Sequence, residues 1–143
     1  MRSDPPQAGL YIIRPKDAPG QALLIGPIER IFPPPTVPVR VGDKLIDRWL
    51  LKNAKDNTFN VFAGRGNLND YKWINKVDNA LFVSPDKEPD NFRFESAGNG
   101  LVTIGIPSKD LLLTLGDEVP QLTFKPANGS SAQRFELIQI LRD

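Results

Sequence analysis

Arg30 and Ile31 lie in a proline-bracketed segment, residues 27–38, and are the pair of residues with the most specific chemistry in the chain. Five prolines surround this pair. Each proline fixes φ at about −65° and pushes the residue before it toward extended geometry. We therefore expect a stiff, extended and exposed loop, whose conformational entropy is largely lost before it meets a partner. The candidate binding residues in this loop are Ile28, Glu29, Arg30, Ile31 and Phe32.

A preorganised loop of this kind suits insertion into the active site of a protease, because stiffness lowers the entropic cost of binding and keeps the two cut ends together. Arg30 followed by Ile31 would suit a trypsin-like serine protease, whose deep pocket accepts a guanidinium and pairs it with a carboxylate. Two other interpretations stay open. In the first, the segment is a proline-rich connection that only covers the barrel, with Ile31 and Phe32 turned inward. In the second, it is a polyproline ligand for an aromatic groove.

Two further loops carry candidate residues for protease binding. Glycines permit tight turns in residues 64–70, where Asn67 or Asn69 could be offered to an asparagine-specific protease. The glycine spacing there is not a phosphate-binding fingerprint, and no helix follows. Gly20 ends a turn over residues 16–20 that could wedge into a protease cleft. The alternative interpretations are a plain flexible loop for residues 64–70 and an ordinary turn for residues 16–20.

The composition argues against catalysis. The chain has no histidine and no cysteine, which excludes Ser-His-Asp and Cys-His nucleophiles, thiolate zinc sites and iron–sulfur clusters. Ser108 is followed by Lys109, but nothing around this pair supports an oxyanion site. The acidic residues Asp86, Glu88 and Asp90 lack the glycine of a calcium loop, so we expect a solvated turn there. We predict a protein that is not an enzyme and that uses no metal and no cofactor.

The charge pattern gives no sign of nucleic-acid or membrane binding. The 18 basic and 17 acidic residues are spread along the chain and leave a formal net charge of +1, whereas nucleic acid and anionic bilayers attract basic patches. No apolar run approaches the roughly 20 residues that span a bilayer. Residues 1–8 are polar and hold no apolar signal-peptide core. We expect a monomeric protein kept in the cytoplasm, with a target protease as its partner.

Short β-strands must position these loops. The 14 prolines and 11 glycines leave little room for long helices, and the runs between them are rich in Leu, Ile, Val and Phe. Asp56 with Asn57, and Asn99 with Gly100, are turn pairs because these residue types tolerate positive φ. The predicted strands cover residues 9–14, 21–25, 37–41, 47–52, 58–63, 71–74, 80–84, 91–96, 101–106, 110–115, 121–125 and 133–140.

Three similar strands divide the chain into repeats. Trp49, Phe92 and Phe135 follow one another at intervals of 43 residues, and each heads a similar strand. Four strands in each of three units, with the closing strand paired to the opening one, predict an all-β fold of the β-trefoil type. The units are residues 9–52, 58–96 and 101–140 of a single domain, with the three aromatic residues in the core. An all-β sandwich with accidental spacing is the alternative.

The two end strands carry a family resemblance. The opening run Gly-Leu-Tyr-Ile, residues 9–12, and the closing run Arg-Phe-Glu-Leu-Ile-Gln-Ile, residues 134–140, resemble those of the mushroom β-trefoil protease inhibitors. The nearest branch is the cospin-like serine protease inhibitors. This resemblance covers the whole chain in length and strand order. It implies a trypsin-binding loop between the second and third strands, in residues 27–38, with Arg30 as its key residue.

The related branch of that family is the mycocypins, such as clitocypin and macrocypin, which inhibit cysteine proteases. By position, this resemblance implies contacts to papain-like enzymes at Gly20 and at residues 42–44. It implies contacts to legumain at Asn67 or Asn69.

A carbohydrate-binding lectin is the main alternative function. Ricin-type lectins share the trefoil and carry a Gln-x-Trp motif, but here the residues two before the three aromatics are Asp47, Asp90 and Gln133, and no unit has both Gln and Trp. Sugar sites also need an exposed aromatic residue beside polar groups. Tyr71 and Trp73 are the candidates near Asp70, although we expect Trp73 in the core.

Overall fold

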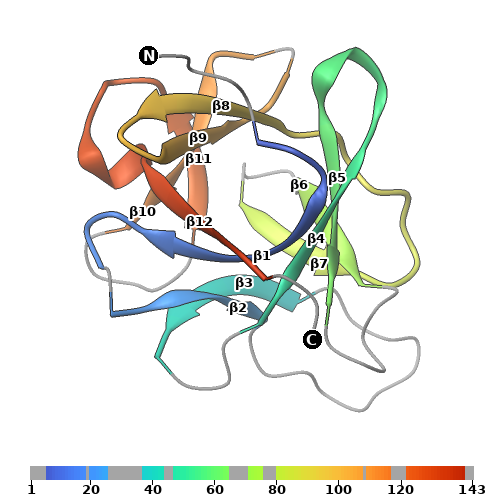
Figure 1. Cartoon of the computed structure of the whole chain (residues 1–143). Coiled ribbons are helices and arrows are strands. Elements are labelled where there is room, and N and C mark those ends of the chain that lie inside the picture. The colour runs from blue at the N-terminus through green and yellow to red at the C-terminus, as the bar shows by residue number, and fades with distance from the viewer. Residues whose placement is uncertain are drawn as a thin grey trace.

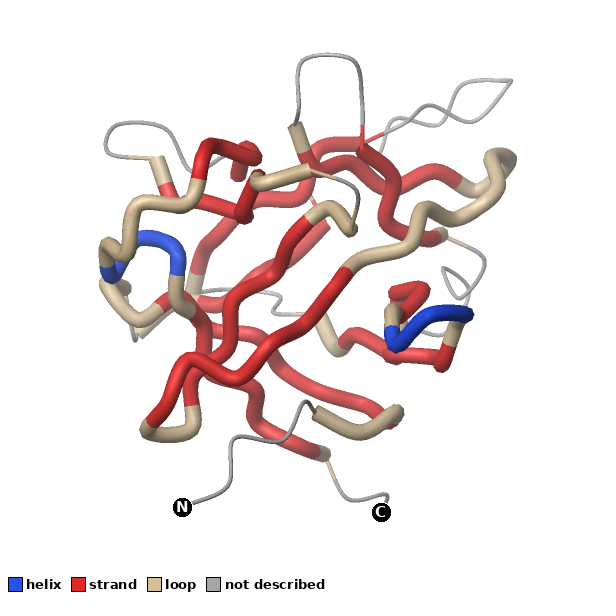
Figure 2. Tube along the Cα trace, turned by 90° about the horizontal axis from the view of Figure 1, so that it is seen from above, coloured by secondary structure: helices blue, strands red, loops and turns tan. Residues whose placement is uncertain are grey.

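A computed structural model describes residues 6–18, 20–25, 37–43, 47–64, 71–75, 80–107, 109–116 and 122–140. Within these ranges the chain forms twelve β-strands and two short 3₁₀ turns (Figures 1 and 2). The strands are β1 (Gly9–Pro15), β2 (Ala22–Ile25), β3 (Val37–Gly42), β4 (Trp49–Asn53), β5 (Phe59–Ala63), β6 (Lys72–Asn75), β7 (Leu81–Ser84), β8 (Arg93–Gly98), β9 (Leu101–Gly105), β10 (Leu111–Leu115), β11 (Leu122–Pro126) and β12 (Phe135–Gln139). The 3₁₀ turns are η1 (Lys55–Asn57) and η3 (Ser131–Gln133).

The observed strands match the predicted ones to within two residues at either end. The turn chemistry also holds. Asp56 and Asn57 have φ of 60° and 61°, and Asn99 and Gly100 have φ of 57° and 78°. These left-handed conformations are the ones that Asn, Asp and Gly adopt at low cost, which explains why the chain reverses at these points.

Six strands close into a barrel. β1 pairs with both β4 and β12, β4 pairs with β5, and β9 pairs with both β8 and β12. The ring closes between β5 and β8, where Phe59 and Phe92 exchange two backbone hydrogen bonds of 2.8 and 2.9 Å. A closed barrel leaves none of these six strands with an open edge.

Three hairpins complete the arrangement. They are β2–β3, β6–β7 and β10–β11, each formed by the second and third strands of a group of four. β3 also pairs with β7, and Ala80 beside β7 bridges Thr123 of β11, so the hairpins contact one another. We call β1–β4, β5–β8 and β9–β12 units one, two and three. The closed ring excludes the two-sheet sandwich.

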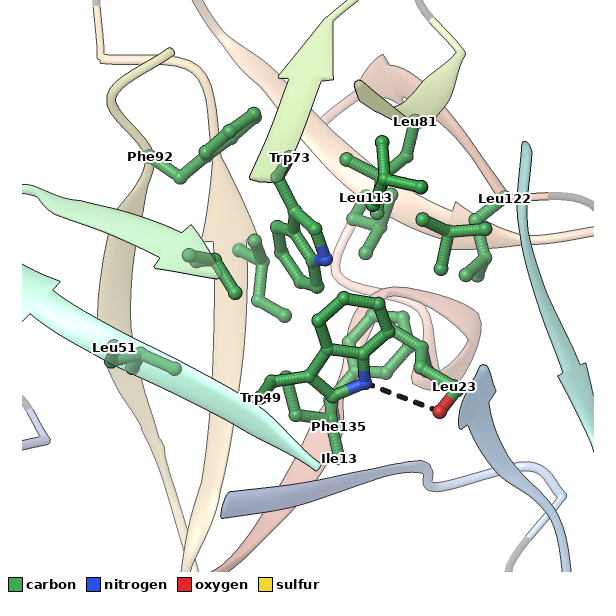
Figure 3. Packing of buried hydrophobic residues seen from close by; sticks show 14 of the residues in the cluster. Ile13, Leu23, Trp49, Leu51, Trp73, Leu81, Phe92, Leu113, Leu122 and Phe135 are labelled. Atoms are coloured by element: carbon green, nitrogen blue, oxygen red, sulfur yellow. Dashed lines mark hydrogen bonds between the residues drawn. The ribbon is translucent and has the colours of Figure 1, made fainter. Parts of the chain in front are cut away.

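The barrel is filled by aromatic and aliphatic side chains, not by a channel. Trp49, Phe92 and Phe135 are fully buried, which confirms their predicted place in the core. Trp73 of β6 lies at the centre, with ring centroids 5.5 Å from Trp49, 5.6 Å from Phe92 and 6.2 Å from Phe94. Figure 3 shows Trp49, Trp73 and Phe92 among core residues from β1 to β12. Such a packed interior leaves function to the loops and the outer surface.

The polar side of the barrel strands faces outward, as alternation requires. In β1, Tyr11 and Ile13 are buried, while Arg14 between Ile13 and Pro15 forms an ion pair of 3.0 Å with Glu136 of β12. None of the helical turns in the described ranges has the length and apolar character of a membrane span.

Candidate functional site

Both ends of the predicted inhibitory loop are anchored in buried, paired strands. Ile25, the last described residue before residues 26–36, pairs with Val39, and Val37, the first described residue after them, pairs with Val83 of the next unit. All four side chains are buried. The predicted loop covered residues 27–38, but its last two residues, Val37 and Pro38, belong to β3. The candidate residues Ile28, Glu29, Arg30, Ile31 and Phe32 lie outside the described residues, so the structure fixes the two stems of this loop and not its tip.

Asp47 holds the first stem directly. The backbone N–H of Ile25 donates a hydrogen bond of 2.6 Å to Asp47 Oδ2, and Asp47 is only 1% exposed. Two residues further on, Trp49 Nε1–H donates to the carbonyl oxygen of Leu23 at 3.2 Å (Figure 3). Sequence reasoning missed this role of Asp47. Its position two residues before Trp49 is the signal that could have suggested it.

Unit two repeats this arrangement at the matching position, and unit three has a different side-chain contact there. In unit two, Asn75 N–H donates to Asp90 Oδ2 at 2.7 Å. In unit three, Gln133 Nε2 donates to Thr114 Oγ1 at 3.1 Å. Asp47 and Asp90 thus accept a backbone N–H from the last residue of β2 and of β6, whereas Gln133 donates to a side-chain hydroxyl one residue before the end of β10. We call Asp47, Asp90 and Gln133 the stem clamps.

A pocket with both polar and apolar lining residues adjoins the second clamp. It has a volume of about 350 Å³ and lies between units two and three. Its lining residues are Asn75, Asp90, Asn91, Phe92, Ile106 and Pro107. A volume of this size is at the lower end of small-molecule sites.

The hydrogen-bonding groups of this pocket are mixed. Asn91 Oδ1 accepts a bond of 2.7 Å from Asn60 Nδ2, an orientation that leaves Asn91 Nδ2 as a donor. Asp90 supplies an exposed carboxylate acceptor, and Ile106 with Pro107 supplies an apolar wall. Among the described lining residues none is basic, and their donors and acceptors can pair with the hydroxyl groups of a ligand.

The remaining predicted sites are only partly visible. Asn67 and Asn69 lie outside the described residues. Gly20 is exposed at the end of a turn in which Gln21 N–H donates to Ala18 O at 2.9 Å. A Cβ added at Gly20 would meet no atom within 4 Å, so this turn offers an open surface.

The aromatic residues proposed for a sugar site are not on the surface. Tyr71 is 7% exposed and Trp73 is fully buried, so neither can stack on a sugar ring in this conformation. The expectation that Trp73 belongs to the core is confirmed, whereas that of an exposed Tyr71 is wrong. Tyr71 is buried because it directly precedes β6, the strand that carries Trp73 into the core.

The acidic turn shows no metal site. Asp86 and Glu88 are exposed, and the N–H of Asp86 donates to Ser84 Oγ at 3.3 Å. No group of three or more metal-ligating side chains comes together in the part of the chain that the structure describes.

Comparisons with known proteins define the fold. No protein-family model and no curated protein sequence matches this chain. Among solved structures, a designed three-fold symmetric protein, ThreeFoil, covers 92% of this chain and 99% of its own length at 13% identity and a TM-score of 0.71. The Rhizoctonia solani agglutinin covers 94% of this chain and 97% of its own length at 15% identity and a TM-score of 0.69. The chain is a β-trefoil.

A third similar structure illustrates how little sequence this β-trefoil shares with its structural neighbours. A salivary protein from Culex quiquefasciatus, of the Cysteine and Tryptophan-Rich family, has a TM-score of 0.73 at 12% identity and covers 98% of this chain and 99% of its own. The present chain has no cysteine and two tryptophans. Identities this low show the fold alone. The resemblance to the mushroom protease inhibitors has no sequence match behind it and stays a prediction.

Proposed function

We propose that this β-trefoil is a protease inhibitor that inserts the loop around Arg30, between β2 and β3, into the active site of a trypsin-like serine protease. The observation that supports the proposal is the anchoring of both loop stems, in which Ile25 and Val37 are buried and paired and Ile25 is also clamped by Asp47. The lack of histidine and cysteine favours binding over catalysis as the activity of this chain.

Anchored stems matter because an inhibitory loop must be a poor substrate. If the protease cuts the loop, stems that stay in place keep the two new ends close together, so that the bond can re-form and the complex persists. In this mechanism Arg30 enters the specificity pocket and its guanidinium pairs with a carboxylate there. Contacts of this kind bury roughly 800 Å² on each partner, which one loop and its neighbours can provide.

The test is a titration of trypsin with the purified protein, with papain and legumain measured in parallel. We expect stoichiometric loss of trypsin activity. The variant Arg30→Ala should weaken inhibition by roughly 2–4 kcal/mol, or about 30-fold to 1000-fold, since a buried and paired anchor is removed. Arg40→Ala, at an exposed arginine of β3, is the matched control and should inhibit like the wild type.

Other outcomes would assign inhibition to a different residue or loop, or would contradict the proposal. Inhibition that survives Arg30→Ala would mean that another residue enters the specificity pocket. Loss of papain activity alone would move the site to the Gly20 turn, and loss of legumain activity alone would move it to Asn67 or Asn69. No effect on any of the three proteases would contradict the proposal.

Carbohydrate binding is a second candidate, and the comparisons support it at least as strongly. One of the similar structures is an agglutinin, and none of the three described above is named as a protease inhibitor. The specific observation in its favour is the pocket at Asp90 and Asn91, whose donors and acceptors suit vicinal hydroxyl groups. A glycan array separates the two candidates. Binding that is lost in Asn91→Ala and kept in Arg30→Ala would favour the lectin.

A further inference from the structure

We infer that a second pocket, between the N-terminal segment of residues 6–8 and the hairpin of β4 and β5, binds a neutral saccharide. Figure 1 shows the start of β1 beside this hairpin. The pocket has a volume of about 630 Å³, and small-molecule sites range over roughly 300–1,000 Å³. It is separate from the pocket at Asp90, and its occupation does not depend on the proposed inhibitory function.

The pocket opens where β1 and β4 stop pairing. Their register ends at Gly9 and Leu51, although β4 continues to Asn53. The carbonyl oxygen of Gln7, which would lie opposite Asn53 if the register continued, accepts instead from the Tyr11 hydroxyl at 2.8 Å. The N-terminal segment therefore diverges from the end of β4 and leaves a space between them.

The backbone of Asn53 presents a donor and an acceptor to this space. Ala54 N–H donates to Thr58 O at 2.9 Å across the hairpin, and successive residues of a strand direct their backbone groups to opposite sides. The N–H and C=O of Asn53 therefore point toward the N-terminal segment, where no described residue pairs with them. The Asn53 side chain lies on the same face as buried Leu51, at the end of the core.

Asn57 and Gln7 add two exposed carboxamides to the pocket lining. Asn57 is held in a fixed turn, in which it has a φ of 61° and the Thr58 hydroxyl donates to Lys55 O at 2.6 Å. Within the described residues, the side-chain amides of Gln7, Asn53 and Asn57 form no hydrogen bond. All three are therefore available to a ligand.

This set of groups fits the chemistry of a sugar. A carboxamide contains both a donor and an acceptor, and so does each hydroxyl group. Two neighbouring hydroxyls of a sugar ring can therefore pair with the oxygen and the nitrogen of one carboxamide. Phe59 belongs to the core and lines the pocket together with Pro6. These two residues provide apolar surface for the C–H face of the ring, while the carboxamides meet its hydroxyl edge.

The experiment titrates the isotopically labelled protein with glucose, galactose, mannose and N-acetylglucosamine, one at a time, and follows the amide resonances by NMR. We expect at least one of these sugars to shift the backbone amide of Asn53 and the side-chain amides of Gln7, Asn53 and Asn57. Asn53→Ala and Asn57→Gly should each raise the dissociation constant about threefold to tenfold, since each removes neutral hydrogen bonds to the ligand. Asn57→Gly keeps the turn, because glycine adopts positive φ at low cost.

Lys55→Ala is the matched control. Lys55 is exposed on the same hairpin and does not line the pocket, so this variant should bind like the wild type. The spectra also show whether each variant is folded, because the dispersed resonances of the barrel then stay in place.

Three results would overturn the inference. The first is that none of the four sugars shifts the resonances of Gln7, Asn53 and Asn57. The second is that the shifts are confined to Asn91, which would assign sugar binding to the pocket at Asp90. The third is a stronger response to N-acetylglycinamide, titrated in parallel, than to every sugar, which would assign the pocket to peptides. Trypsin inhibition enters none of these measurements, so failure of the proposed function would leave the result unchanged.

Discussion

Units one and two share the same hydrogen bond between an aspartate and a strand end, but the two aspartates differ in burial. Asp47 and Asp90 are 43 residues apart, and each accepts a backbone N–H from the last residue of its hairpin's first strand, at 2.6 and 2.7 Å. Asp47 is buried, whereas Asp90 is exposed beside a pocket. A repeated fold can thus keep the position of a residue and its backbone partner while changing what else that residue is free to contact.

The aromatic residues that follow the two clamps, Trp49 and Phe92, also differ in what they contact. Trp49 has an indole N–H and donates it to the stem of unit one, while Phe92 has no polar atom and only packs, with its ring 5.8 Å from that of Phe124. Unit one therefore holds its stem with two side chains and unit two with one. In unit two the second contact to the stem comes from the backbone, where Asp90 N–H donates to Trp73 O at 3.3 Å.

The largest effect should come from removing what both units share. Trp73→Ala takes away the ring that contacts Trp49 of unit one and Phe92 of unit two. The cavity should lower the free energy of unfolding by about 3–5 kcal/mol, as measured by urea denaturation. Trp73→Phe fills part of the cavity and should cost less. A loss below about 1 kcal/mol for Trp73→Ala would contradict the central place assigned to this ring.

A smaller effect should separate the two clamps. Asp47→Ala leaves a buried donor at Ile25 and should lower the free energy of unfolding by about 1–3 kcal/mol. Asp90→Ala exposes Asn75 N–H to water, since this hydrogen bond lies at the surface, and should cost under about 1 kcal/mol. Urea denaturation of the two variants side by side measures the difference. Equal losses would show that burial does not distinguish the clamps.

The smallest effect should appear at alkaline pH and arises from Tyr11 of unit one. Burial raises the pKa of the Tyr11 phenol above its ordinary value of 10.0, and the hydroxyl donates to Gln7 O at 2.8 Å. The folded state binds this proton more tightly than the unfolded state does. The corresponding stability is therefore complete below pH 10.0 and is lost as the pH rises through the folded pKa. The free energy of unfolding, measured between neutral and strongly alkaline pH, should decrease more steeply with pH for the wild type than for Tyr11→Phe.

The sequence predicted the strands and the repeat because both signals are local. Alternating apolar runs between prolines and glycines mark each strand, and the equal spacing of Trp49, Phe92 and Phe135 marks the units. The stem clamps were not predicted. The position of Asp47 two residues before Trp49 marks its place in the repeat, but its contact with Ile25 depends on how a hairpin folds back over the barrel, and no local pattern gives that partner.

The candidate sites also differ in whether local sequence patterns could predict them. The pocket at Asp90 joins residues of units two and three, such as Asn75 and Ile106, that no local pattern connects. The burial of Tyr71 was missed for a similar reason, because a tyrosine beside a polar loop is compatible with either face of the strand that follows. Arg30 stays a prediction from residue type and loop chemistry, outside the described residues.

The pairing of β1 with β12 has a consequence for how the molecule is made. Arg14 and Glu136, which face each other across these strands, are 122 positions apart in the chain. Contacts between such distant positions slow folding, since a long chain must be closed before they form. A chain growing on the ribosome exposes an edge of its first strand until almost all of the sequence has been synthesised. Closure of the barrel is then a late event, and until it happens the nascent chain carries the open edge that the finished barrel lacks.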